Sequence, residues 1–293
     1  MKRSQQGFPI VVSDRTLYRY MVTKHLGEGG FGEVFQARIR SLRLNVALKR
    51  FKLDPGGTRA GRERWAREAS THGSMSHPNI LQVLDAFKYE GFLYLATELA
   101  TGSLDNCTPP QGWDELEVMR AGMHVSSALH YMHTAWTDEG PLIHRDVTPN
   151  NIFYFQEASL FKIGDFGIAK ALDGEDGVAV TQIANWSFVA PELVKDGFSV
   201  PQSDLFQLGL VLYFMAQGES AIPTNLSVAD RKRSVVGGAA YRAASDAPFE
   251  SEGLQGCIKK LLLRDMDKRY QSASEVFADL RAVHREARRK DDP

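Results

Sequence analysis

Two polar stretches of the sequence carry side chains whose spacing suits proton transfer and cation binding. Within residues 143–151, Asp146 and Asn151 stand five residues apart, with Pro149 between them. The Asp146 carboxylate can accept a proton from a hydroxyl, and the Asn151 amide oxygen can ligate a hard cation. A second carboxylate, Asp165, opens an Asp-Phe-Gly stretch fourteen residues after Asn151. We expect a polar loop that packed elements hold in place and that presents these groups to a substrate.

A third stretch is rich in glycine and suits phosphate binding. It reads Gly27-x-Gly29-x-x-Gly32, and a strand-like run resumes at Val34. Glycine lets the backbone turn sharply and approach a phosphate closely, so we expect a β-hairpin with a glycine tip. A dinucleotide-binding turn shares this spacing but needs a helix directly after the glycines. Residues 33–37 alternate like a strand, which disfavours that alternative.

Lys49 lies inside the apolar strand-like run 45–51. An unpaired buried ammonium is costly, so Lys49 either faces water at a strand edge or points at an anion. Because the run follows the glycine hairpin, we favour the phosphates of a nucleotide. The charged, helix-permissive stretch 60–74 offers Glu68 as the partner of Lys49, with Glu63 as the second choice. The other charges of that stretch are interpreted as a solvated helix face.

The elements that must position these groups change character near residue 98. Strand patterns cover residues 81–87 and 92–98, whereas helical patterns dominate after Trp113. The polar stretch 143–151 lies between a predicted helix over 118–132 and a predicted strand over 152–155. Residues 1–17 are interpreted as an extension.

The C-terminal third is predicted to be mainly helical. Residues 203–215 are apolar on all sides and predict a buried helix, with Asp204 near its start as a cap. Polar residues 230–251 predict a loop with a short helix. Amphipathic helices are predicted over 254–263 and 273–283, with a turn at 265–270, and the charged tail from about Arg285 is expected to fray.

The composition is that of an ordinary globular protein. The chain has 293 residues, 43% apolar and 24% charged, and a net charge of −1, which gives no reason to expect nucleic acid as a partner. The chain has only two cysteines, Cys107 and Cys257, and they have no metal-ligand spacing. So few cysteines favour a reducing compartment over a disulfide scaffold. The longest apolar run, 208–216, is far below the roughly 20 residues of a membrane span. With no signal peptide recognisable, a cytoplasmic location is expected.

Taken in order, these motifs resemble those of the eukaryotic-type protein kinase family, over about residues 20–283. The set comprises the glycine loop through Val34, Val-Ala-Leu-Lys ending at Lys49, His-Arg-Asp ending at Asp146 with Asn151, the Asp-Phe-Gly at 165–167 and Ala-Pro-Glu at 190–192. The resemblance is to the Ser/Thr type, with short loops like those of bacterial members. It implies an α+β, bilobal kinase-like fold, with a small antiparallel β-sheet lobe carrying one helix and a larger, mainly helical lobe. The implied kinase domain covers 18–285, with a small lobe at 18–97, a hinge at 98–101, a large lobe at 102–285 and a charged tail at 286–293.

The resemblance also implies ATP and Mg²⁺ as cofactors and assigns roles in phosphoryl transfer. Asp146 would orient the substrate hydroxyl and accept its proton. Lys49 would contact the α- and β-phosphates and be held by Glu68, while Asn151 and Asp165 would hold Mg²⁺. The implied ATP site consists of Gly27, Gly29, Gly32, Val34, Ala47, Lys49, Thr97, Glu98, Ala100 and Phe153, with adenine between Val34 and Ala47 above and Phe153 below.

Further residues receive supporting roles from the same resemblance. Glu192 and Arg269 would form a buried ion pair beneath the activation segment. His144 and Phe166 would pack in a spine that Asp204 anchors through backbone contacts. His72 falls where that spine usually takes an aliphatic residue, and we interpret it as a packing residue and not a metal ligand.

Two positions depart from the Ser/Thr kinase pattern. Thr148 occupies the place of the usual Lys two residues after Asp146, and Asn185, followed by Trp186, replaces the usual Thr before Ala-Pro-Glu. Losing one preorganised charge contact typically costs about 3 kcal/mol, so either another cation compensates or transfer is slow. Pro149 is retained as in the Ser/Thr type, which favours Ser/Thr specificity and leaves a Tyr or dual-specificity kinase as an alternative.

The leading function is therefore a protein kinase that autophosphorylates in its activation loop. Arg145 suggests control by phosphorylation, with Thr181 as the expected regulatory phosphosite and Ser187 as a structural residue. The alternative from another class is a pseudokinase that acts as a nucleotide-regulated binding module. Protein substrates are the expected partners. A homodimer through the small lobe is raised by family analogy and supported by no motif, and the chain is either a free kinase or a fragment.

Overall fold

The computed structural model describes residues 10–12, 19–29, 32–51, 65–66, 69–70, 72–137, 140–165 and 186–291. These residues fall into two compact units. The described residues of the first unit come from Met1–Ser76, Ile80–Ala100 and Asp165, and those of the second come from His77–Asn79, Thr101–Gly164 and Asp176–Pro293. The chain passes from the second unit to the first between Gly164 and Asp165.

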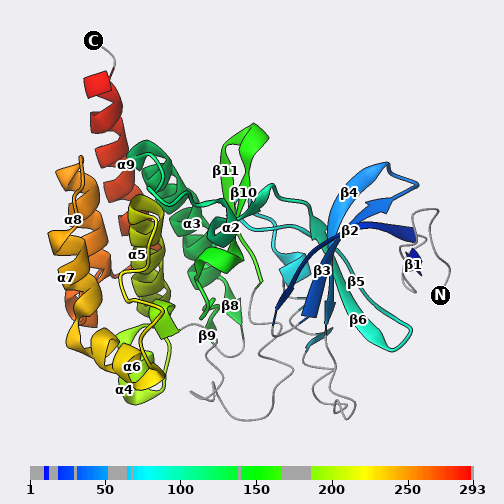
Figure 1. The fold of residues 1–293 in the computed structure, drawn as a ribbon, viewed down its shortest axis with the longest axis horizontal. Helices are drawn as coiled ribbons and strands as arrows, with labels where there is room; N and C mark the ends of the chain where they lie inside the picture. The colour runs from blue at the N-terminus through cyan, green and yellow to red at the C-terminus, as the bar shows by residue number, and fades with distance from the viewer. Residues whose placement is uncertain are drawn as a thin grey trace. The chain divides into compact units, whose positions relative to one another are not determined.

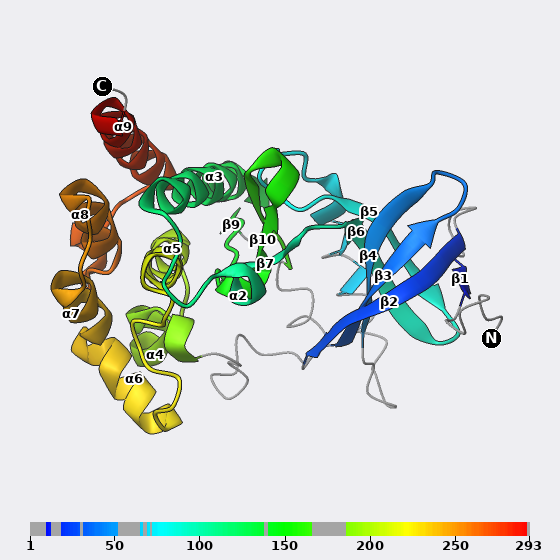
Figure 2. The ribbon, with the colours of Figure 1, turned by 45° about the horizontal axis from the view of Figure 1, so that its top comes forward.

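A six-stranded antiparallel sheet with the order β1-β2-β3-β4-β6-β5 makes up most of the described part of the first unit (Figures 1 and 2). Successive side chains of a strand face opposite sides of a sheet. One side buries an aromatic and aliphatic layer, in which the rings of Tyr20 and Tyr94 each stack on Phe87 with centroids 5.3 Å apart. The strands are β1 (Ile10–Val12), β2 (Arg19–Gly29), β3 (Gly32–Ile39), β4 (Leu44–Phe51), β5 (Val83–Tyr89) and β6 (Phe92–Glu98).

Three long helices form the centre of the second unit. They are α3 (Glu115–Thr134), α5 (Pro201–Gln217) and α9 (Ala273–Asp291), and α3 packs against both of the others (Figures 1 and 2). Gly122 lies at this crossing, because a Cβ atom there would be 2.6 Å from Leu280 of α9 and 3.1 Å from Leu212 of α5. A residue without a side chain is therefore what allows the helices to approach so closely.

Shorter elements surround these helices. Strands β10 (Ile152–Phe155) and β11 (Leu160–Ile163) form a small sheet with β7 (Gly102–Ser103), and β8 (Trp136–Thr137) pairs with β9 (Gly140–Pro141). The remaining helices are α2 (Leu104–Cys107), η1 (Pro149–Asn151), η2 (Gln156–Ala158), η5 (Trp186–Phe188), α4 (Pro191–Asp196), α6 (Val228–Gly237), α7 (Ala239–Asp246), α8 (Glu252–Leu261) and η6 (Met266–Lys268).

The predicted strand over 152–155, the buried helix over 203–215 and the α+β class are confirmed, but three local predictions are wrong. Residues 230–251 are mostly helical, because the Ser227 hydroxyl caps α6 and Gly238, with φ +77°, separates α6 from α7. Helix α9 continues to Asp291, past the predicted helix end at residue 283. Asp204 does not cap α5, whose N-cap is Val200.

Among the helices of the described ranges, none is both long and apolar enough to cross a membrane.

Candidate active site

The predicted glycine hairpin is confirmed in the first unit. Strands β2 and β3 pair antiparallel up to Gly29 and Gly32, and the residues between these two lie outside the described ranges. A Cβ atom on Gly32 would lie 2.1 Å from the carbonyl oxygen of Arg50 on β4. Only glycine fits this contact, so the end of the hairpin next to its turn lies directly on the strand that carries Lys49.

One face of the sheet collects the predicted nucleotide-binding side chains. Val34 of β3 lies opposite Lys49 of β4, and Ala47 lies opposite Thr97 of β6. Opposed residues, and residues two apart on one strand, share a face. The register therefore places Val34, Ala47, Lys49 and Thr97 together, on the face opposite to the core layer around Val46 and Leu48.

Lys49 and Asp165 form an ion pair within the first unit. The Lys49 ammonium lies 2.8 Å from the Asp165 carboxylate, and the two side chains are 19% and 31% exposed. Asp165 has φ +57°, in the left-handed region that costs most L-residues about 1–2 kcal/mol. The surroundings thus hold Asp165 in an unfavourable backbone conformation. The predicted partner of Lys49, Glu68, and the second choice, Glu63, lie outside the described residues.

Three residues of the implied ATP site, Thr97, Glu98 and Ala100, lie at or just after the end of β6. Thr97 is buried, whereas Glu98 and Ala100 are partly exposed. The Glu98 side chain accepts a hydrogen bond from the Gln82 backbone at 2.8 Å, and the Glu98 backbone N–H donates to the Gln82 carbonyl at 3.1 Å. These contacts fix the backbone at the point where the sequence pattern predicts a hinge.

In the second unit, Asn151 holds Asp146 through two hydrogen bonds. Its amide nitrogen donates to the Asp146 carbonyl at 2.9 Å and to the Asp146 carboxylate at 2.8 Å. The backbone carbonyl of Asn151 accepts a hydrogen bond from the backbone N–H of Gly164 at 2.9 Å. Because both donated bonds use the amide nitrogen, the amide oxygen of Asn151 is turned to the other side as an acceptor.

Asp204 anchors the backbone on the N-terminal side of Asp146. Its side chain is fully buried and accepts from the backbone N–H groups of His144 and Arg145, each at 2.8 Å. Arg145 has φ +66°, so the anchor holds a second strained residue. His144 is buried, receives the Asp146 N–H at Nδ1 and therefore donates through Nε2 to the Gly164 carbonyl, at 3.1 Å. The predicted backbone contacts of Asp204 are confirmed. His144 is buried, and its predicted packing with Phe166 stays a prediction, because Phe166 lies outside the described residues.

Two polar residues of this network escaped the sequence analysis. His133 Nε2 lies 2.8 Å from the Asp204 carboxylate. Gln207 accepts from the Val147 N–H at 3.1 Å and donates to the Phe188 carbonyl at 2.9 Å. The available signal was a glutamine inside the otherwise apolar run of α5, where a buried amide must find partners.

The predicted buried ion pair between Glu192 and Arg269 is confirmed. Arg269 Nη1 lies 3.0 Å from Glu192 Oε1, and the two side chains are 0% and 3% exposed. Ser203 donates a further hydrogen bond to Glu192 at 2.6 Å. Arg269 also donates to the carbonyls of Gln202 and Leu263 at 2.7 and 3.0 Å. Three segments of the second unit are thus joined at one buried guanidinium.

The structure also shows where other residues from the sequence predictions lie, but it does not test the roles predicted for them. Thr148 is buried, and Phe153 lies on β10 between β7 and β11. Ser187 is buried, as is His72, whose Nε2 lies 2.9 Å from the Leu81 carbonyl oxygen. Phe166, Thr181 and Asn185 lie outside the described residues. Within the described ranges, no group of three or more His, Cys, Asp or Glu side chains could hold a metal ion.

The sequence was also compared with known proteins. A family model described as the protein kinase domain matches residues 20–279. The chain belongs to the protein kinase domain family. The predicted resemblance is therefore confirmed, and the sheet unit and the larger helical unit are those that the family implies.

Relatives of this kinase domain come from bacteria and plants. The chain is 29% identical over 275 residues to a probable serine/threonine-protein kinase of Clostridium perfringens, covering 92% of the chain and 38% of that protein. It is 31% identical over 294 residues to a serine/threonine-protein kinase of Myxococcus xanthus, covering 94% of the chain and 51% of that protein. An L-type lectin-domain containing receptor kinase of Arabidopsis thaliana is 30% identical over 205 residues, covering 68% of the chain and 30% of that protein. The kinase domain thus spans between 30% and 51% of the length of these relatives.

Proposed function

We propose that this chain is an ATP- and Mg²⁺-dependent protein kinase that transfers the γ-phosphoryl group of ATP to Ser or Thr hydroxyls of proteins. Membership of the kinase domain family and the names of the bacterial relatives support the class of reaction. The observation that carries the proposal is the pair of hydrogen bonds, 2.9 and 2.8 Å, by which Asn151 orients Asp146. A positioned carboxylate of this kind suits proton acceptance from a hydroxyl.

The residues of the first unit suit a bound nucleotide. Val34, Ala47 and Thr97 give the sheet face small or apolar side chains, against which a planar base can lie. Lys49 brings an ammonium to the same face for the phosphates. Glycine at position 32 lets the hairpin backbone approach β4, the strand that carries Lys49.

The donor chemistry of Asn151 and Asp165 fits Mg²⁺. Magnesium prefers hard oxygen ligands and is commonly bound by one or two carboxylates together with substrate phosphates. Asn151 offers an amide oxygen, because its nitrogen is committed to Asp146, and Asp165 offers a carboxylate. When bound, Mg²⁺ would neutralise charge on the transferred phosphoryl group.

Asp146 is the proposed proton acceptor. The substrate hydroxyl oxygen forms a bond to the γ-phosphorus, the bond between that phosphorus and the oxygen of the leaving ADP breaks, and the hydroxyl proton passes to the Asp146 carboxylate. Asn151 keeps this carboxylate in place, and Asp204 fixes the backbone before it. Catalysis in this reaction rests mainly on such positioning.

Ser/Thr specificity is proposed from Pro149 together with the Ser/Thr kinase relatives. Thr148 is buried and short, so position 148 supplies no cation for the γ-phosphate. We therefore expect a turnover slower than that of kinases with Lys at this position. Control by phosphorylation of Thr181 remains part of the proposal, supported by the exposed Arg145 beside Asp146.

The proposal is tested by incubating purified wild type and Asp146→Asn with γ-labelled ATP, Mg²⁺ and casein. We expect label on casein and on the wild-type chain, with phosphoserine and phosphothreonine after hydrolysis. Asp146→Asn should transfer at most about one hundredth as much label. Equal label with both proteins would remove the catalytic role of Asp146. ATP binding without any transfer by the wild type would favour the pseudokinase, and phosphotyrosine would favour the Tyr alternative.

A further inference from the structure

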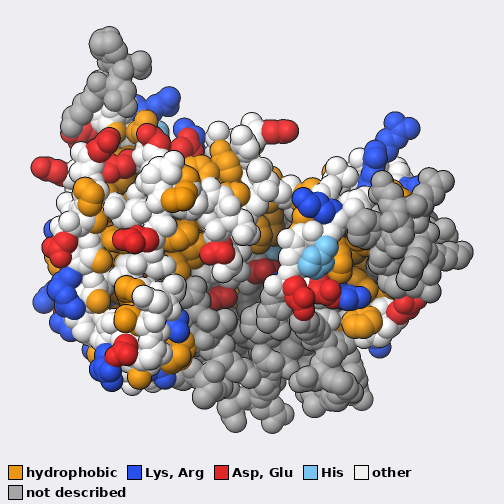
Figure 3. Space-filling model, viewed as in Figure 1, with side chains coloured by type: hydrophobic (Ala, Val, Ile, Leu, Met, Phe, Trp, Pro, Cys, Tyr) orange, Lys and Arg blue, Asp and Glu red, His pale blue; other side chains and the backbone are white. Residues whose placement is uncertain are grey.

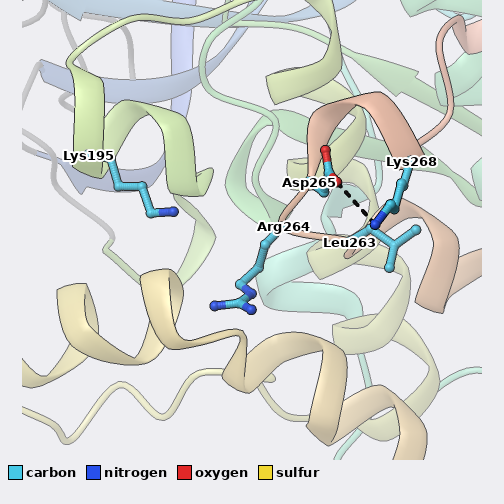
Figure 4. A pocket seen from close by; sticks show the side chains of 5 residues that line it. All are labelled: Lys195, Leu263, Arg264, Asp265 and Lys268. Atoms are coloured by element: carbon cyan, nitrogen blue, oxygen red, sulfur yellow. Dashed lines mark ion pairs between the residues drawn. The ribbon is translucent and has the colours of Figure 1, made fainter.

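A basic pocket lies in the second unit, and none of its residues has a role in the proposed transfer reaction. Its volume is about 450 Å³, and it is lined by Lys195, Leu263, Arg264, Asp265 and Lys268. Figure 4 shows that Lys195 comes from α4, whereas the other four residues come from the segment between α8 and α9. The lining thus carries three cationic side chains and one carboxylate.

The single carboxylate is already engaged. One oxygen of Asp265 accepts from the Asp267 N–H at 3.2 Å and caps η6, and the other lies 3.4 Å from the Lys268 ammonium. Within the described ranges, neither Lys195 nor Arg264 has a carboxylate at ion-pair distance. The pocket therefore keeps a net positive charge that its own lining does not neutralise.

Arg264 is held in a defined position. Its Nη1 donates to the Val236 carbonyl at 3.1 Å. Its stem lies against Gly238, where a Cβ atom would be 3.0 Å from Arg264 Cδ, and Gly238 has φ +77°. One donor of the guanidinium is committed, and among the described residues the other donors meet no acceptor, so they can bind a ligand. Fixing an arginine in advance lowers the entropic cost of binding an anion.

The elements that carry the cations are fastened to one another. Glu192 on α4, three residues before Lys195, pairs with Arg269, which directly follows Lys268. Arg269 also donates to the carbonyl of Leu263, beside Arg264. The buried ion pair described above thus fixes the spacing between the two walls of the pocket.

We propose that this pocket binds an acidic segment of a protein substrate. The inference rests on the proposed kinase function only in calling the bound protein a substrate, and the binding of an acidic segment does not depend on that function. Carboxylates match the charge of the lining, and the guanidinium fork of Arg264 suits bidentate carboxylate binding. A volume of about 450 Å³ admits a few residues of a peptide. Binding there would raise the local concentration of a tethered hydroxyl without touching the transfer site.

Binding is tested directly with a fluorescein-labelled glutamate-rich peptide and a glutamine peptide of the same length. Anisotropy should show binding of the glutamate peptide only, weakening steeply as salt rises. Arg264→Glu and Lys195→Glu should each weaken binding about tenfold or more. Lys88→Glu is the matched control, because it makes the same charge change at an exposed lysine of the first unit, and it should change binding by less than about twofold.

Several results would overturn the inference. Equal binding of both peptides, or an Arg264→Glu variant that binds as tightly as wild type, would remove it. Displacement of the peptide by millimolar inorganic phosphate, with tighter binding of a phosphoserine peptide, would assign the pocket to phosphate instead. Thermal unfolding checks each variant, and Arg264→Gln serves where Arg264→Glu does not fold.

A kinetic arm separates this inference from the proposed function. Casein variants with and without an acidic tract are phosphorylated by wild type and Arg264→Gln. We expect Arg264→Gln to raise KM about tenfold for the acidic variant only, with kcat unchanged. If neither casein variant is phosphorylated, the proposed function fails while the peptide-binding result stands. If both are phosphorylated with KM unchanged by the substitution, docking fails while the kinase activity stands.

Discussion

At the residue scale, Asn151 orients Asp146 and is also a proposed Mg²⁺ ligand. Its amide nitrogen fixes both the carbonyl and the carboxylate of Asp146, and its amide oxygen is the group proposed for Mg²⁺. The same side chain would therefore position the proton acceptor and the metal relative to each other. A carboxylate at position 151 would keep an oxygen ligand but lose both donated bonds, which explains why an amide suits this position.

A charged pair between β3 of the glycine hairpin and β4 offers a residue-scale prediction. Glu33 lies opposite Arg50 in the sheet register and accepts its hydrogen bonds, while the guanidinium lies over Phe92 at 4.9 Å. The Glu33 and Arg50 side chains are 24% and 28% exposed. A double-mutant cycle with Glu33→Gln and Arg50→Met should give a coupling energy of about 1 kcal/mol.

This coupling is measured by urea unfolding and should shrink as salt rises, because the pair is partly exposed. Since the pair lies next to the turn end of the glycine hairpin, Arg50→Met should also raise KM for ATP more than it lowers kcat. Strictly additive single changes would contradict the interpretation.

At the scale of elements, helix α5 supports the loop that carries Asp146. Asp204 and Gln207 stand three residues apart and so lie on neighbouring positions of one helix face. Asp204 binds the backbone at His144 and Arg145, and Gln207 binds it at Val147. A rigid apolar helix thus presents two buried polar groups to one irregular segment.

Gln207→Met should lower both stability and rate. The change leaves the Val147 N–H and the Phe188 carbonyl without their partner, and a buried unsatisfied group costs about 1–3 kcal/mol. Unfolding in urea measures the stability. The control is Leu208→Met on the same helix, a swap of similar volume that should cost below about 1.5 kcal/mol and leave kcat unchanged. Equal kcat for wild type and Gln207→Met would show that Gln207 does not position the loop.

The contact between α3 and β11 predicts a pH effect on stability. His124 Nδ1 accepts from the Phe161 N–H at 3.3 Å. Burial, followed by the charge of Arg120, lowers the pKa of His124 to about 4. The unfolded chain takes up this proton near pH 6.5, so the contribution is full above that pH and is lost as the pH falls toward 4.

The matched variant is His124→Asn, which keeps an acceptor near Nδ1 and does not titrate. The wild type should lose about 1–2 kcal/mol relative to His124→Asn between pH 7 and pH 4.5, less than the full linkage value because the ring is partly exposed. Urea unfolding of both proteins at each pH gives this difference. A difference that stays constant with pH would show that His124 is not the titrating group.

The element patterns also show what the sequence could and could not predict. Strand β10 and helix α5 could be predicted from local apolar patterns. A short apolar run predicts a strand, and a longer run that is apolar on all sides predicts a buried helix. Over residues 230–251 only one short helix within a loop was predicted, whereas the structure has α6 and α7, because the polar composition does not reveal the Ser227 cap or the left-handed Gly238. His133 and Gln207 meet residues 71 and 60 positions away, and no local pattern encodes such a meeting. The motif order predicted Asp146, Asn151 and Asp165 as candidate site residues, but it did not predict the hydrogen bonds that orient them.

At the scale of the whole molecule, the chain divides into two units that carry different parts of the proposed chemistry. The first has the sheet face with Lys49 and the Asp165 carboxylate, and the second has Asp146 and Asn151. On the face shown in Figure 3, acidic and basic side chains are interspersed, in keeping with a net charge of −1. Charge as a whole therefore selects no partner, and selectivity must come from local sites such as the basic pocket.

Nucleotide binding should stabilise the molecule and depend on Asp165. MgATP at about one hundred times its Kd adds about 2.7 kcal/mol, which for a chain of this size raises Tm by roughly 5 °C. With Asp165→Asn, the rise with MgATP should fall to that seen with ATP and EDTA, because a carboxylate ligand of Mg²⁺ is lost. Calorimetry with and without Mg²⁺ makes the comparison. An undiminished Mg²⁺ effect in Asp165→Asn would move the metal site elsewhere.

The central claim is that Asp146 accepts the proton of the attacking hydroxyl in a phosphoryl transfer that this chain performs. The most direct test is a single-turnover rapid-quench measurement of label transfer from MgATP to a protein substrate. We predict that Asp146→Asn lowers the transfer rate by about two to three orders of magnitude while the Kd for MgATP stays within about twofold. A transfer rate equal to that of the wild type, at equal MgATP affinity, would contradict the account.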